Sequence, residues 1–166
     1  AHIQPEHVIA EYRKLYPKYS ATEVFFAATT AGRSWRGAVI EAELRAAQGS
    51  PAYVYQLNYR SPLENGHFGA MHGMDIPLVF DNIAQPGSRT GRDADAQKAA
   101  DQMSEAFLAF ARTGKPTHAG IPEWRPDELP TRATMVFDAS SQLVNDPRGE
   151  ERKLFAKVPY IQRGTY

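Results

Sequence analysis

Residues 93 to 113 carry the feature that most restricts how this chain can fold. Apolar side chains recur there at helical spacing and form one continuous face, made of Ala96, Ala99, Ala100, Met103, Phe107, Phe110 and Ala111. Gly114 and the following Lys115-Pro116 provide the stop signal of a helix. Because such a face needs a sheet to cover, the pattern predicts a long helix packed on a β-sheet. We expect its methionine and phenylalanines to be core residues, and not part of a cofactor site.

The clearest strand lies at residues 52–59, where β-branched and aromatic side chains dominate. Alternate side chains share one face of it, namely Tyr53, Tyr55, Leu57 and Tyr59. A helical stripe precedes the strand, from a capping-box pattern at Ser20 to about Gln48. Gly32 is expected to kink or split this helix, since glycine costs ~1 kcal/mol relative to alanine there. The order of helix, strand and helix predicts an α/β fold, in which loops at the carboxyl ends of strands carry the chemistry.

Further elements are predicted towards both ends of the chain. Residues 5–15 read as a short helix that Pro17 ends. Residues 133–137 form a strand that turns and returns through 142–144, and a charged helix opens at Pro147. We find no internal repeat and no convincing domain boundary, so the whole chain is expected to be one segment of a single domain.

Composition excludes several classes of function. Of the 166 residues, 42% are hydrophobic and 23% are charged, as in an ordinary globular protein. Nineteen Lys and Arg balance nineteen Asp and Glu, so no net field attracts nucleic acid or an anionic membrane. No apolar run approaches the ~20 residues of a membrane helix, and the first residues are not a signal peptide. The absence of cysteine excludes disulfides and thiolate-bound metals, but it does not indicate a compartment.

The candidate site is a histidine bracketed by glycines. His72 follows the predicted strand, between Gly69 and Gly73, which allow the backbone to turn sharply. Histidine is also the side chain best able to move a proton near neutral pH. His67 is a rival, but it lacks an acid three residues later, so we interpret it as a loop histidine. From the residues alone, a lone histidine in a loop is more often structural or merely exposed than catalytic.

The same residues carry a family resemblance. The run GAMHGMDIPLVF at 69–80 resembles the histidine segment of the type B carboxylesterases, which include the para-nitrobenzyl esterases and the cholinesterases. The similarity extends to four more segments: residues 109–116, Trp124, residues 135–138 and residues 145–148. The resemblance implies an α/β-hydrolase fold, in which His72 is the general base of a Ser-His-Glu triad that hydrolyses small-molecule carboxylic esters.

The other parts of that machinery are missing from the chain. No Gly-x-Ser-x-Gly elbow is present, and Gly32-Arg33-Ser34-Trp35-Arg36-Gly37 is a near miss inside a helical pattern. The glycine-rich oxyanion loop and the acid segment are absent too. We therefore expect residues 1–166 to be the C-terminal part of a longer α/β-hydrolase domain, inactive alone and partnered by the N-terminal remainder of the same protein.

Asp75 and Gly73 are expected to act around the histidine. The resemblance implies that Asp75 is not the triad acid but a buried acid in the hydrogen-bond network that lies behind the catalytic groups, near the nucleophile. A buried carboxylate requires hydrogen-bond donors, so we expect donors around Asp75 if it lies inside. An acid in the first turn of a helix that begins near Ile76 is an equal alternative.

No cofactor or metal is expected. The histidines do not pair at the spacing of a zinc site: His2, His7, His67, His72 and His118. Residues 86–92 contain glycine and arginine but match neither a P-loop nor a dinucleotide fingerprint, so we interpret them as a solvated loop.

Two other interpretations remain beside the esterase. Some members of the superfamily keep the fold without the triad and act as binding or adhesion modules. A self-standing structural domain is the third possibility. The apolar helix faces argue against it, because an uncovered face of several hundred Å² promotes aggregation.

Overall fold

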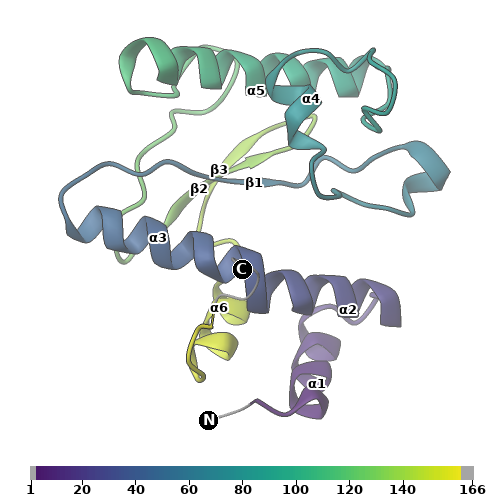
Figure 1. Ribbon diagram of the computed structural model, residues 1–166, viewed down its shortest axis with the longest axis vertical. Helices are drawn as coiled ribbons and strands as arrows, with labels where there is room; N and C mark the ends of the chain where they lie inside the picture. Colours follow the sequence, from purple (N-terminus) through teal and green to yellow (C-terminus); the bar gives the residue numbers. More distant parts are fainter. Residues whose placement is uncertain (1–2, 162–166) are drawn as a thin grey trace. The chain divides into compact units, whose positions relative to one another are not determined.

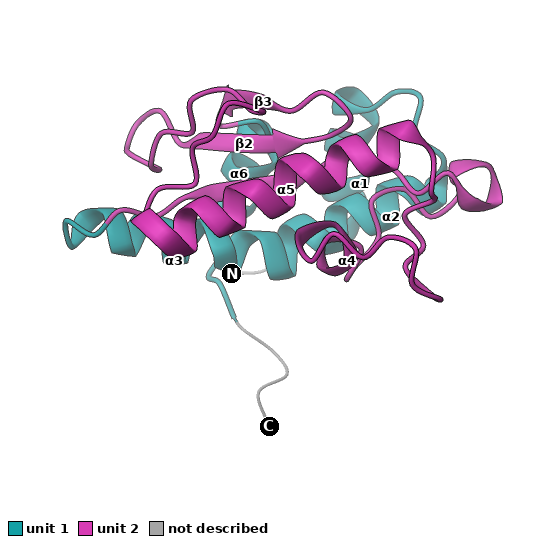
Figure 2. Ribbon diagram, turned by 90° about the horizontal axis from the view of Figure 1, so that it is seen from above, with its two compact units in different colours: residues 1–50, 147–166 teal, residues 51–146 magenta. Residues whose placement is uncertain are grey.

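The computed structural model describes residues 3–161. The chain divides into two compact units: residues 1–50 with 147–166, and residues 51–146 (Figure 2). Each unit has its own core and is described separately below. Within the described residues, no helix is both long and apolar enough to span a membrane.

The first unit is helical (Figure 1). Its elements are α1 (Pro5–Leu15), α2 (Ala21–Thr30), the π-helix η1 (Ala31–Trp35), α3 (Arg36–Ala47) and α6 (Gly149–Ala156). The helix predicted at residues 5–15 is confirmed. The capping box is also present, because Ser20 Oγ accepts from the Glu23 amide at 3.2 Å and the Ser20 amide donates to Glu23 Oε2 at 2.8 Å.

Gly32 lies where the predicted long helix changes its winding. The chain passes from α2 through the π-helical turn η1 into α3, so the expected break is found within a continuous helical path. A Cβ on Gly32 would lie 3.0 Å from a ring carbon of Phe155 in α6. The glycine therefore lets α6 pack directly against the helix, since a side chain there would displace the phenylalanine ring.

A buried polar cluster accompanies the apolar core of this unit. Glu151 is almost completely buried, and Arg148 holds it with Nε at 2.7 Å from Oε1 and Nη2 at 2.5 Å from Oε2. Tyr16 donates to Oε1 at 2.6 Å, and the Tyr12 hydroxyl donates to Oε2. Burial, reinforced by these bonds to Glu151, raises the pKa of both tyrosines above the usual range. The Arg148 guanidinium also lies 4.8 Å from the centre of the Trp35 ring, and this partly buried tryptophan packs against the core of the unit.

The second unit contains the sheet. Its elements are β1 (Val54–Leu57), the 3₁₀ turn η2 (Leu63–Gly66), α4 (Asp75–Val79), α5 (Ala94–Thr113), β2 (Ala133–Phe137) and β3 (Gln142–Asn145). The strand order is β1-β2-β3, with β1 and β2 parallel and the β2–β3 hairpin antiparallel. Tyr55 pairs with Met135, which in turn pairs with Leu143. The strand and hairpin predicted from the sequence are therefore found, with β1 shorter than the eight residues expected.

Helix α5 lies along one side of this sheet (Figure 1). The Asp93 side chain caps it by accepting from the Ala96 amide at 2.8 Å, and Gly114 ends it in the left-handed conformation. Ala96, Ala99, Ala100 and Met103 are fully buried, as predicted, whereas Ala111 is exposed, so that part of the prediction is wrong. Phe107 and Phe110, however, are 38% and 49% exposed, so the prediction that they are core residues is wrong for these two rings. They pack on Tyr55 and Tyr53, beside the edge strand β1 of a three-stranded sheet, which is too narrow to cover both faces of each ring.

Candidate active site

The candidate site begins where β1 ends. Pairing continues past the strand, because the amides of Asn58 and Tyr59 both donate to the Phe137 carbonyl, at 2.8 and 3.1 Å. Buried Ser61 then closes the base of the following loop. Its amide donates to the Gly69 carbonyl at 3.0 Å and its hydroxyl to the Arg89 carbonyl at 2.6 Å. This loop therefore leaves the sheet in a fixed direction.

His72 lies in a tight turn after that loop. Gly69 and Gly73 both have positive φ, at +59° and +79°, which explains why the histidine is bracketed by glycines. The His72 side chain is exposed to solvent, and no described residue forms a hydrogen bond with its ring. The imidazole is thus presented on the surface of the described chain.

The residues that follow the turn anchor it to the core. The side chains of Met74 and Leu78 are buried in the cluster formed by the sheet and α5. His72 is therefore displayed by a short turn whose next residues are fixed in a packed interior. Such an arrangement restricts the position of the backbone from which the ring projects.

Asp75 is the first residue of α4 and is half-buried. The Tyr55 hydroxyl donates to its Oδ2 at 2.9 Å. Burial, followed by the hydrogen bond to Asp75, raises the pKa of Tyr55 above its ordinary value. Asp75 is thus an acid in the first turn of a helix, and it also has a hydrogen-bond donor, the Tyr55 hydroxyl.

Tyr55 is the residue that sequence reasoning missed. The sequence predicts only that it shares one face of the strand with Tyr53, Leu57 and Tyr59, and its ring packs on Phe107 and Phe137. Twenty residues separate it from Asp75, so no local pattern links the two. The available signal was a tyrosine, which carries a hydroxyl, on a face otherwise expected to be buried.

The other candidate residues, His67 and Ser34, do not lie in a comparable turn anchored to the core. His67 is exposed at the end of η2. Its ring packs edge-on against the Phe68 ring, with 5.2 Å between the two ring centres. Ser34, in the near-miss elbow sequence, is exposed within the π-helix η1 and not at a strand-to-helix turn. Among residues 3–161, no group of three His, Asp or Glu side chains is arranged to hold a metal ion.

Comparison with known proteins decides the family. The model of the carboxylesterase family matches residues 17–154, which is most of the chain. The chain belongs to the carboxylesterase family. Among curated proteins, phenmedipham hydrolase of Pseudarthrobacter oxydans is 31% identical over 101 residues, which are 58% of this chain and 20% of that protein.

Solved esterases share the fold of this carboxylesterase-family chain. The carboxylesterase EST55 of Geobacillus stearothermophilus superposes with a TM-score of 0.79 at 32% identity, covering 93% of this chain and 32% of its own. An esterase of Clostridium hathewayi superposes with a TM-score of 0.71 at 27% identity. The match covers 93% of this chain and 30% of the esterase chain. A para-nitrobenzyl esterase, at 23% identity and a TM-score of 0.68, adds support for the fold alone.

These matches confirm the predicted fold class. The described residues are a partial α/β-hydrolase, with helices and a small sheet consistent with the expected C-terminal part of that fold. The chain spans a fifth of the length of phenmedipham hydrolase and about a third of the solved esterases.

Proposed function

We propose that residues 1–166 are the C-terminal segment of a single serine carboxylesterase domain, and that His72 is its general base. The nucleophilic serine, the triad glutamate and the oxyanion hole would come from the N-terminal remainder of the same protein. The observation that carries the proposal is an exposed imidazole on a glycine-bracketed turn, after the carboxyl end of β1 and anchored through Met74 to the core. Family membership supports it.

The proposed reaction follows from the proton chemistry of imidazole. Neutral His72 takes the proton of the serine hydroxyl while the serine oxygen attacks the ester carbonyl carbon. The resulting imidazolium returns that proton to the leaving alkoxide oxygen, which departs as the alcohol and leaves an acyl-serine. His72 then takes a proton from water while the water oxygen attacks the acyl carbonyl carbon, and it gives this proton to the departing serine oxygen, which releases the carboxylic acid and restores the serine and neutral His72. General-base work of this kind contributes roughly 10²–10⁴-fold to the rate.

Gly73 and Asp75 have supporting roles in this proposal. Gly73 supplies the left-handed backbone that the turn needs, with φ at +79°. Asp75, bonded to Tyr55, ties the residues after His72 to β1. Both act on the direction of the imidazole and neither contacts the reacting atoms, so they are positioning residues.

The substrate class is inferred from family and relatives together. One structural relative is described as hydrolysing aliphatic aromatic polyesters, and the curated relative is named as a phenmedipham hydrolase. For this protein we propose small-molecule carboxylic esters as substrates. Short-chain aryl esters such as p-nitrophenyl butyrate are suitable probes, because the released phenol is coloured.

A fluorophosphonate probe separates an esterase from a non-catalytic binding or adhesion module of the same fold. In the full-length protein, the proposal expects stoichiometric labelling of one serine outside residues 1–166 and parallel loss of p-nitrophenyl butyrate hydrolysis. A protein that neither labels nor hydrolyses the ester is a binding module, and the proposal fails. Isolated residues 1–166 should show no activity, since the triad acts as a unit; turnover by the isolated chain would place the nucleophile within it.

A further inference from the structure

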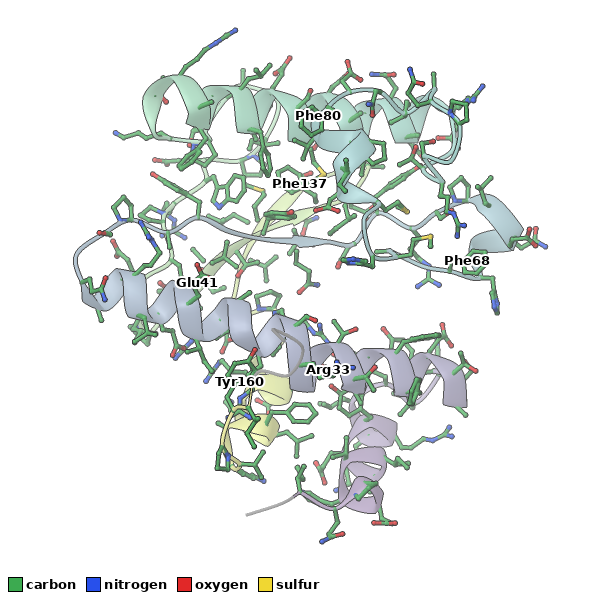
Figure 3. All side chains as sticks on the ribbon, viewed as in Figure 1. Arg33, Glu41, Phe68, Phe80, Phe137 and Tyr160 are labelled. Carbon is green, nitrogen blue, oxygen red and sulfur yellow. The ribbon has the colours of Figure 1, made fainter. Side chains whose placement is uncertain are left out.

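A groove in the first unit lies outside the site described above. Its two walls are the helical path η1–α3 and the segment that follows α6, and it encloses about 1050 Å³ while opening to solvent. Figure 3 labels Arg33 and Glu41 on the helical wall and Tyr160 on the other. The volume is of the size that holds a small organic molecule.

Two glycines set the distance between these walls. Phe155 lies against Gly32, and a Cβ on Gly37 would overlap the hydroxyl of Tyr160. Arg36 fastens the second wall, because its Nη2 donates to the Val158 carbonyl at 2.5 Å and its guanidinium lies 5.7 Å from the Tyr160 ring centre. The groove therefore has a fixed width, and Arg36 is already engaged in holding it.

The middle of the groove is apolar. Ile40 and Leu44 line the helical wall, with Val158 and Ile161 opposite. Leu44 is 58% exposed and Ile161 is 67% exposed, although both face the same hollow. An apolar body bound between them would remove this surface from water, which is favourable.

The charges of the groove are arranged unevenly along its length. Arg33 and Arg36 lie near one end of the helical wall, and no described carboxylate pairs with exposed Arg33. At the other end Arg45 lies one helical turn from Glu41, so that its charge has a counterpart nearby. Arg33 and Arg45 are twelve positions apart along the helical wall, so they lie towards opposite ends of it. The uncompensated positive charge is therefore at the Arg33 end.

We propose that this groove binds an amphipathic monocarboxylate of medium chain length. The carboxylate is held by the free guanidinium of Arg33, which offers the paired N–H donors that suit a carboxylate. The apolar chain lies along Ile40 and Leu44 towards Arg45. The site is independent of His72 and does not rest on ester hydrolysis.

The test uses a diazirine-bearing decanoate with the full-length protein, followed by peptide mapping of the cross-links. Cross-links are expected in the peptides covering residues 33–48 and 155–161, with competition by decanoate but not by decanol. Arg33→Gln should reduce cross-linking at these peptides about tenfold. Arg45→Gln is the matched control at the other end of the groove and should change it less than about twofold.

A second variant keeps the test decisive if Arg33→Gln alters folding. Leu44 is largely exposed, so Leu44→Glu should leave the melting temperature unchanged while repelling the ligand and abolishing the cross-links. Cross-links confined to other peptides, or cross-linking at the wild-type level in both Arg33→Gln and Leu44→Glu, would overturn the proposal. His72→Ala should leave groove labelling intact, which separates this site from the proposed esterase.

Discussion

The Tyr55 hydroxyl donates a 2.9 Å hydrogen bond to Asp75 Oδ2 and thereby joins β1 to the first residue of α4. His72 lies three residues before Asp75, in the turn that leads into this helix. The bond thus connects the sheet to the segment that displays the imidazole. Its loss should affect the direction of His72 more than the stability of the fold.

Tyr55→Phe tests this connection in the full-length protein. Removal of the hydroxyl leaves Asp75 without its donor, so kcat/KM for p-nitrophenyl butyrate should fall roughly tenfold, as expected for a misdirected reacting group. The free energy of unfolding should fall by about 1–2 kcal/mol. Tyr53→Phe is the matched control, because Tyr53 lies on the same face of the sheet and packs on Phe110 and Trp124. Equal activity in both variants would show that the hydrogen bond between Tyr55 and Asp75 does not position His72.

Gly73→Ala tests whether the left-handed turn is needed at the site. Nothing lies within 4 Å of a Cβ on Gly73, so the substitution costs only the backbone strain of φ +79°, about 1 kcal/mol. Gly49→Ala is a closely matched control, with φ +72° and equally open space in the first unit. We expect similar losses of stability from both and a loss of esterase activity from Gly73→Ala alone. Full activity in Gly73→Ala would show that the turn tolerates another backbone conformation.

Tyr59 should make stability depend on pH in alkaline solution. Burial, together with the charges of Asp93, Asp95 and Asp138, raises its pKa to about 12. An unfolded tyrosine has a pKa of about 10. The folded state therefore favours the protonated form, which contributes stability fully below pH ~10 and loses it as the pH rises to about 12. Tyr59→Phe should show a shallower decline in unfolding free energy over this window; an identical decline would contradict the assignment.

Glu151→Gln should be strongly destabilising in the first unit. The substitution leaves the guanidinium of Arg148 buried without its counter-ion and weakens the bonds from Tyr12 and Tyr16, so we expect a loss of about 3 kcal/mol. Glu150→Gln is the control, because Glu150 forms an exposed pair with Lys153 and should cost less than about 1 kcal/mol. Urea unfolding of the two variants compares these costs. Equal losses would mean that the buried cluster contributes no more than a surface pair.

Local patterns were sufficient for most elements of the fold. The capping box at Ser20, the cap at Asp93 and the stop at Gly114 each depend on residues within a few positions, so the helix ends could be predicted. The position of His72 after a strand was predictable for the same reason. The turn that carries it requires a left-handed backbone conformation at Gly69 and Gly73, and glycine in the sequence indicates such positions directly.

Contacts between distant residues could not be predicted in this way. Tyr12 and Glu151 meet across 139 positions, and Tyr55 and Asp75 across 20. The half-exposed rings of Phe107 and Phe110 depend on the width of the sheet beneath them, which no helical pattern encodes. The apolar face of α5 therefore predicted that a sheet was present, but not how much of the face it covers.

The central claim is that His72 is the base that activates a serine. The most direct test is kcat/KM for p-nitrophenyl butyrate in full-length His72→Ala, with His67→Ala, a neighbouring exposed loop histidine, as the control. The account predicts a loss of at least roughly 10³-fold in the first variant, because the general base is removed, and a change of less than about twofold in the second. Wild-type turnover by His72→Ala, or an equal loss in His67→Ala, would contradict it.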